Sequence, residues 1–75
     1  AAKAAERLVF GLRLAEGVDL DEVLAEGGDD AWRSRWTEQM TAWIRRGMMV
    51  RNGPRWALTR RGMDWADRVA VDLMP

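Results

Sequence analysis

The spacing of apolar residues changes near the middle of this chain, and this change constrains the fold more than any other feature. Over residues 32–44, large apolar side chains recur at the spacing of one helix face: Trp32, Trp36, Met40, Trp43 and Ile44. The next stretch, MMVRNGPRWAL (residues 48–58), places an Asn-Gly pair between two short apolar runs, which is typical of a β-hairpin. The sequence therefore predicts a helix over much of Ala31–Arg46, ended by Gly47 and followed by a hairpin.

Helical patterns lie on both sides of this unit. Apolar residues at helical spacing predict a first helix, Asp19 and Glu22 are placed as the capping box of a second, and Thr59 as the N-cap of a last one. The glycines of the EGGDD stretch (residues 26–30) predict a break. The expected flanking helices are Ala2–Glu16, Leu20 to about Ala25, and Thr59 to about Leu73. This order predicts a mainly α fold with a small β-hairpin, of winged-helix type, with the hairpin as the wing.

Composition excludes several classes of function. The 75 residues are expected to form a single domain, and they include no cysteine and no histidine. Thiolate metal sites, nucleophile–histidine pairs and the usual haem ligands are therefore excluded, and we predict no catalytic, cofactor-binding or metal-ligating residue here. The absence of disulfides and of any long apolar run predicts a cytoplasmic protein without a membrane span. Because the chain begins with alanine, we expect it to be a fragment of a longer protein.

Opposite charges are segregated along the sequence although the net charge is zero. Seven acidic residues and no basic residue lie within residues 14–32, whereas residues 39–63 contain six arginines and no acid. The six are Arg45, Arg46, Arg51, Arg55, Arg60 and Arg61, and they surround the predicted hairpin. Two of them, Arg60 and Arg61, fall in the first turn of a predicted helix, where the helix dipole disfavours cations. We therefore predict that the arginines contact an anionic partner; the alternative is that the charge blocks face each other or are only solvated.

Three segments in this order resemble one protein family. They are FGLRLAEGVDL (Phe10–Leu20), IRRGMMV (Ile44–Val50) and WALTRRGMDWADRV (Trp56–Val69). Together they are similar to the C-terminal domain of the oxygen-independent coproporphyrinogen III oxidase-like family of radical S-adenosylmethionine proteins, particularly its haem-chaperone branch. The string G-L-R-x-x-E-G-V-D-L is the more specific part, because L-T-x-x-G at residues 58–62 is common in winged helices.

The resemblance implies a parent protein whose chemistry lies outside these residues. In that family an upstream radical domain holds a [4Fe–4S] cluster through three cysteines, beside S-adenosylmethionine, and acts on coproporphyrinogen III or transfers haem. The implied role of this chain is a non-catalytic accessory domain that docks on or covers the radical domain. The predicted partners of the arginines are then an acidic surface of that domain or the carboxylates of a tetrapyrrole.

Two other interpretations of the sequence are stacking by the tryptophans and binding of DNA. Five tryptophans could stack on bases or porphyrins, but their shared spacing with Met40 and Ile44 favours core packing, and Trp56 is the one whose exposure decides the question. An independent winged-helix DNA-binding module is the alternative function. Neutral net charge and Glu38 on the outward face of the recognition-position helix disfavour it.

Overall fold

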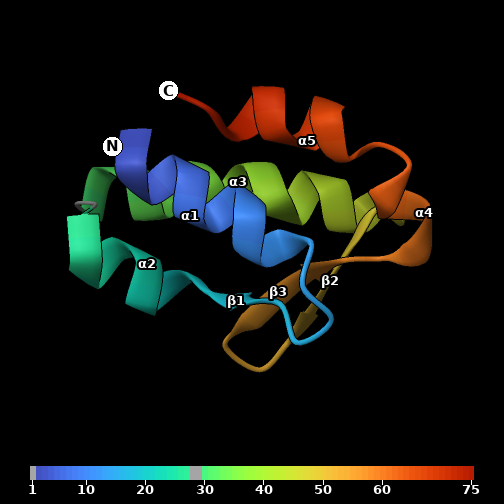
Figure 1. Ribbon diagram of the computed structural model, residues 1–75, viewed down its shortest axis with the longest axis horizontal. Coiled ribbons are helices and arrows are strands. Elements are labelled where there is room, and N and C mark those ends of the chain that lie inside the picture. The colour runs from blue at the N-terminus through green and yellow to red at the C-terminus, as the bar shows by residue number, and fades with distance from the viewer. Residues whose placement is uncertain (1, 28–29) are drawn as a thin grey trace.

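The computed structural model describes residues 2–27 and 30–75, so part of the predicted break at residues 26–30 lies outside the described residues. A three-stranded antiparallel sheet with strand order β1-β3-β2 lies along one side of the helices (Figure 1). The predicted mainly helical domain with a hairpin is confirmed. The elements are α1 (Ala2–Leu12), β1 (Val18–Asp19), α2 (Leu20–Gly27), α3 (Asp30–Arg45), β2 (Met49–Asn52), β3 (Arg55–Leu58), α4 (Arg60–Met63) and α5 (Ala66–Leu73).

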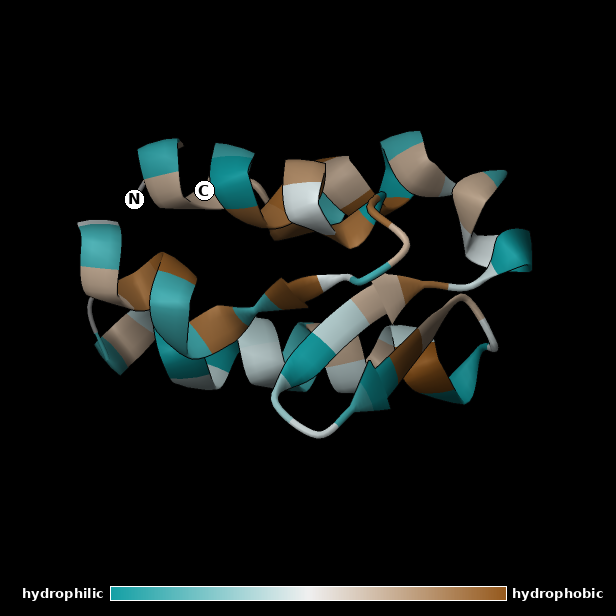
Figure 2. Ribbon diagram, turned by 60° about the horizontal axis from the view of Figure 1, so that its bottom comes forward, coloured by the Kyte–Doolittle hydropathy of each residue, from teal (hydrophilic) through white to brown (hydrophobic). Residues whose placement is uncertain are grey.

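The core is built around α3, as its apolar stripe predicts. Trp36, Met40 and Trp43 are buried, and the Trp36 indole Nε1 donates a hydrogen bond of 2.9 Å to the Leu73 carbonyl oxygen. This bond joins α3 to the last residue of α5. Residues of α1, α2, α3, α5 and the sheet contribute to one apolar core, and Figure 2 shows how hydrophobic and hydrophilic positions are distributed along these ribbons.

The hairpin forms as expected and gains a third strand that the sequence did not predict. β2 pairs with β3 from Met49↔Leu58 to Asn52↔Arg55, and β1 pairs with the other edge of β3 through Val18↔Trp56. Two residues are too few to show an alternating pattern, so β1 left no signal. Trp56 is 2% exposed, which places it in the core and removes it as a stacking platform.

The first helix is shorter than predicted. It ends at Leu12 instead of Glu16 because Arg13 and Leu14 donate to carbonyl oxygens only three residues back, which turns the chain out of the helix. The turn brings Val18 to the edge of β3. Gly17, which directly follows the predicted helix, lies in the loop before β1 with φ of +72°.

The last helix is divided into α4 and α5, which corrects the prediction of one continuous helix after Thr59. Asp64 and Trp65 donate to Arg61 and Gly62, again three residues back, and Trp65 has the non-helical angles φ −110° and ψ 13°. Val69 and Leu73 of α5 face the core.

The acid-rich and arginine-rich segments meet at the sheet, where Asp19 of β1 pairs with Arg55 of β3. Their outer helices are separated: in Figure 1 both labelled ends of the chain and α2 lie at one end of the molecule, and α4 lies at the other. The longest dimension, horizontal in that view, is 29 Å. The acids of α2 are therefore distant from Arg60 and Arg61 of α4, whereas β1 lies beside Arg55.

Candidate anion-binding surface

All six candidate arginines are exposed, but they come from three different places. Arg45 ends α3 and Arg46 follows it, Arg51 and Arg55 lie on β2 and β3, and Arg60 and Arg61 begin α4. Arg45, Arg46, Arg60 and Arg61 lie at two helix ends that a hydrogen bond from Thr59 to Gly47 joins, and we call these four the α3–α4 arginines. Arg51 and Arg55 form a separate pair, the hairpin arginines.

The end of α3 is fixed by backbone hydrogen bonds. Gly47, with φ of +78°, donates to the Ile44 carbonyl oxygen, and Met48 donates to that of Trp43. This is the Schellman arrangement, in which a glycine in the left-handed region ends the helix. It confirms Gly47 as the residue that stops α3 and sets the direction in which Arg46 leaves the helix.

A single hydroxyl joins the end of α3 to the start of α4. Thr59 Oγ1 donates to the Gly47 carbonyl oxygen at 2.7 Å and accepts from the Gly62 backbone N–H at 3.0 Å. The predicted N-cap is confirmed, and it has a second function in holding the two helix ends together. A Cβ at Gly47 would lie 3.9 Å from Nη1 of Arg61, so this guanidinium lies against the end of α3.

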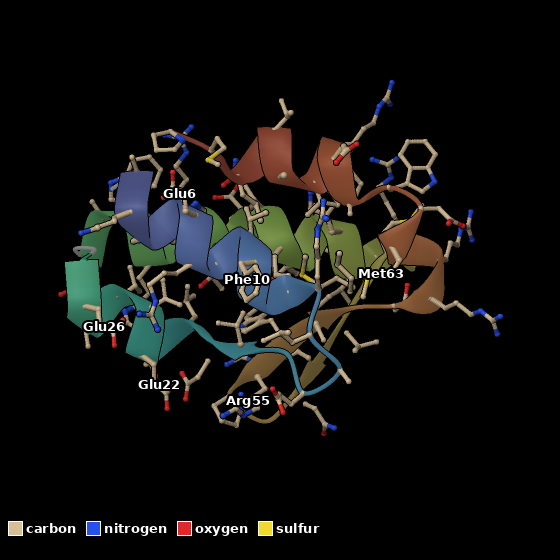
Figure 3. All side chains as sticks on the ribbon, viewed as in Figure 1. Glu6, Phe10, Glu22, Glu26, Arg55 and Met63 are labelled. Carbon is tan, nitrogen blue, oxygen red and sulfur yellow. The ribbon has the colours of Figure 1, made fainter. Side chains whose placement is uncertain are left out.

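The hairpin arginines contact their own chain. Cζ of Arg51 lies 4.5 Å from the centroid of the Trp56 ring, and its Nε donates to the Gly53 carbonyl oxygen at 3.0 Å. Arg55 donates from Nη1 to the Gly17 carbonyl oxygen at 3.3 Å. Figure 3 shows Arg55 on the side of the molecule that carries Glu22, away from Met63 of α4. The two arginines thus support the hairpin and the loop before β1.

Arg46 lies between two indole rings. Its Cζ is 4.6 Å from the ring centroid of Trp43 and 5.6 Å from that of Trp65. Arg68 of α5 stacks on the same Trp65 ring at 5.2 Å, so it joins this surface although the sequence analysis did not single it out. The sequence signal for Arg68 is that it follows Trp65 by three residues, a spacing that places two side chains on the same face of a helix.

Acidic residues between positions 14 and 32 form ion pairs with arginines other than the six candidates. Among the described residues, Arg7 pairs with Glu26, and Arg33 pairs with Asp21 and, at 3.6 Å, with Asp30. The side-chain hydrogen bond that Arg33 donates to Asp21, with smaller contributions from the charges of both carboxylates, raises the pKa of Arg33 above its ordinary value. The remaining ion pair of the described part of the chain, Arg13–Asp67, also leaves the six candidate arginines unused.

The described residues contain no group of three or more histidine, cysteine, aspartate or glutamate side chains arranged to hold a metal ion. Within the same residues, no helix has both the length and the apolar character needed to cross a bilayer.

Comparison with known families supplies the next observation. The family model described as the HemN C-terminal domain matches residues 1–65. This chain belongs to that family. The comparisons with curated proteins and with solved structures returned no match. The matched region includes all six candidate arginines and every element from α3 through α4 in full, and α5 lies beyond it.

Proposed function

We propose that this chain is the non-catalytic accessory domain of a cytoplasmic HemN-like radical S-adenosylmethionine protein, and that it docks on the radical domain through the α3–α4 arginines. The observation that carries the proposal is the family match over residues 1–65. The exposure of these four arginines, outside every described ion pair, supports their role in docking.

The cofactors of such a protein would be held outside this chain. A [4Fe–4S] cluster needs thiolate ligands, and no cysteine is present here, so these residues do not fit the cluster. Oxidation of coproporphyrinogen III or transfer of haem is assigned to the radical domain. The accessory domain contributes a surface of guanidinium groups, which pair with the carboxylates of a protein or of a tetrapyrrole in forked geometry.

The proposal is tested first by the coding sequence that precedes Ala1. We expect a C-x-x-x-C-x-x-C motif within an upstream domain. That domain, expressed separately, is then titrated with this chain and with the double variant Arg60→Gln/Arg61→Gln. Binding should weaken as salt is raised, and the double variant should bind less tightly, because two charge-assisted contacts are lost.

The matched control is Lys3→Gln/Arg7→Gln, which removes the same charge from α1 at the opposite end. It should bind the radical domain like the wild type. Equal weakening by both double variants would show a general charge effect and would contradict docking through α4.

Thermal unfolding separates a docking role from a structural one. The Arg60→Gln/Arg61→Gln variant should have an unchanged or slightly higher Tm, since two cations leave the first turn of α4. A clear fall in the Tm of the isolated chain would mean that these side chains stabilise the fold.

A second candidate function is DNA binding, favoured by the hairpin that follows α3 and by the arginines beside it. Exposed Glu38 on α3 opposes it, because a carboxylate on that face repels phosphates. Titration with duplex DNA at low and moderate salt distinguishes the two. Little affinity is expected for an accessory domain, whereas a DNA-binding module would bind with a steep dependence on salt.

A further inference from the structure

The α3–α4 arginines are not equivalent, because Arg46 differs from its neighbours in how it is held. Trp43 and Trp65 lie 4.6 and 5.6 Å from its Cζ, one indole from α3 and the other from the junction between α4 and α5. Arg45, one residue earlier, has no such ring contact in the described structure. Arg45 and Arg46 therefore carry the same guanidinium group, but in the part of the chain that the structure describes only the conformations of the Arg46 side chain are restricted by ring contacts.

Stacking leaves the binding edge of a guanidinium open. The group is planar, and its five N–H donors point outward in that plane, so a ring on its face occupies none of them. Among the described residues no hydrogen bond or ion pair of the Arg46 guanidinium occurs, and the side chain is exposed. A partner that approaches the edge therefore finds a forked donor whose side-chain entropy is already reduced.

The second arginine of this stack extends the surface onto α5. Arg68 lies 5.2 Å from the Trp65 ring, so Trp65 contacts a guanidinium from α5 as well as the one that follows α3. Trp65 can do this because the chain leaves the helical path there, with φ of −110°. The break between α4 and α5 thus places Trp65 where it contacts both Arg46 and Arg68.

We propose that Arg46, held by the rings of Trp43 and Trp65, is the anchor of a carboxylate-binding site, with Arg68 as a second cation on the same tryptophan. The inference rests on the proposed docking function and names its central contact. The ligand is an aspartate or glutamate side chain presented by the partner surface.

The surroundings of Arg46 favour a single carboxylate over a nucleic-acid backbone. A shallow depression of about 530 Å³ beside it is lined by Trp43, by the two cations Arg35 and Arg46, and by the two acidic side chains Glu38 and Asp72. A row of phosphates crossing this depression would meet both acids. A single carboxylate can bind the edge of the Arg46 guanidinium without crossing the part of the depression that Glu38 and Asp72 line.

The binding test compares lysine substitutions at two adjacent arginines. Arg46→Lys and Arg45→Lys keep the charge, but only the first removes a stacked, forked group. With a short fluorescent oligoglutamate peptide as the probe, Arg46→Lys should weaken binding about fivefold to tenfold, and Arg45→Lys about twofold or less. Equal losses in the two variants would overturn the anchor.

NMR tests the stacking without any ligand. In the wild-type chain the Arg46 Nε–H proton should be displaced from the Arg45 signal by ring currents, and Trp65→Leu should reduce that displacement. Oligoglutamate should then shift the Arg46 signal more than the Arg45 signal. Coincident Arg45 and Arg46 signals in the wild type would contradict a held guanidinium, whatever the variant does to stability.

The anchor and the docking function can fail separately. Wild-type-like binding of Arg46→Lys to the radical domain would remove the anchor and leave docking intact. Failure of the wild-type chain to bind that domain, with the oligoglutamate result as expected, would remove docking and leave a carboxylate site. Tighter binding of duplex DNA than of oligoglutamate, dependent on Arg46, would overturn the carboxylate assignment.

Discussion

At the residue scale, Gly62 determines how closely α4 approaches the end of α3. A Cβ at this position would collide with the carbonyl oxygen and carbon of Met48, which are backbone atoms without a flexible end to move. Thr59 also donates to that carbonyl from its backbone N–H, at 3.0 Å. Any side chain at position 62 would therefore clash with the backbone of Met48.

We predict that Gly62→Ala lowers the free energy of unfolding by about 3 kcal/mol, as overpacking against rigid backbone does. Gly27→Ala is the control, because a Cβ there meets nothing within 4 Å and φ is not positive. That variant should be neutral or more stable by up to about 1 kcal/mol. Urea unfolding measures both, and similar values for the two variants would contradict the close approach at Gly62.

Residue types and spacing were enough to predict the burial of Trp36, Met40 and Trp43 on α3, whereas Trp32 and Ile44 of the same stripe are only partly buried. The stack of Arg46 on Trp65 could not be predicted, because the two residues belong to different elements and meet only where α4 gives way to α5. The separation of Arg51 and Arg55 from the other arginines was missed for a similar reason. Their acceptors are Gly53 and Gly17, whose carbonyl oxygens the sequence does not place.

At the element scale, the joint between α3 and α4 depends on the Thr59 hydroxyl. It donates to Gly47 and accepts from Gly62, so it satisfies groups at the end of one helix and the start of the other. The joint holds the end of α3, which Arg46 follows, next to the start of α4, and its loss should affect binding as well as stability.

We predict that Thr59→Ala destabilises the chain by about 1–2 kcal/mol, since both hydrogen bonds are lost. Thr59→Ser keeps the hydroxyl and should retain most of that stability. Thermal or chemical unfolding followed by circular dichroism gives both values. A serine variant as unstable as the alanine variant would show that the methyl group, and not the hydroxyl, matters at this joint.

Long periodic elements were predicted well, and short elements and breaks were not. The stripe of α3 and the two halves of the hairpin gave strong signals, whereas β1 is too short to have a period. The break at Asp64 and Trp65 left no glycine or proline at those positions to mark it. It arises because α5 must turn to pack against α3, where Trp36 bonds to Leu73.

At the scale of the whole molecule, the match to the HemN C-terminal domain ends at residue 65, yet α5 contributes to the core. Val69 and Leu73 are 1% and 0% exposed, and the Leu73 carbonyl is the acceptor for the buried Trp36 indole. A variant that ends after Trp65 would expose this face of α3. The loss of two buried side chains alone is worth about 3–6 kcal/mol, comparable to the whole stability of a small domain.

We therefore predict that the chain shortened to residues 1–65 shows no cooperative thermal transition and that its tryptophan emission moves to longer wavelength. The full 75-residue chain is the reference. A cooperative transition at the same Tm in the shortened chain would mean that the matched region folds without α5.

Hydrogen exchange of this chain, alone and bound to the separately expressed radical domain, tests the central claim most directly. The claim is that the apolar core supports an outward-facing group of arginines at the α3–α4 end, and that this end meets negative groups of a partner. The account predicts slower exchange on binding at the end of α3 and in α4, with α2 unchanged. Slower exchange confined to α1, β1 and α2, around the acidic segment, would contradict it.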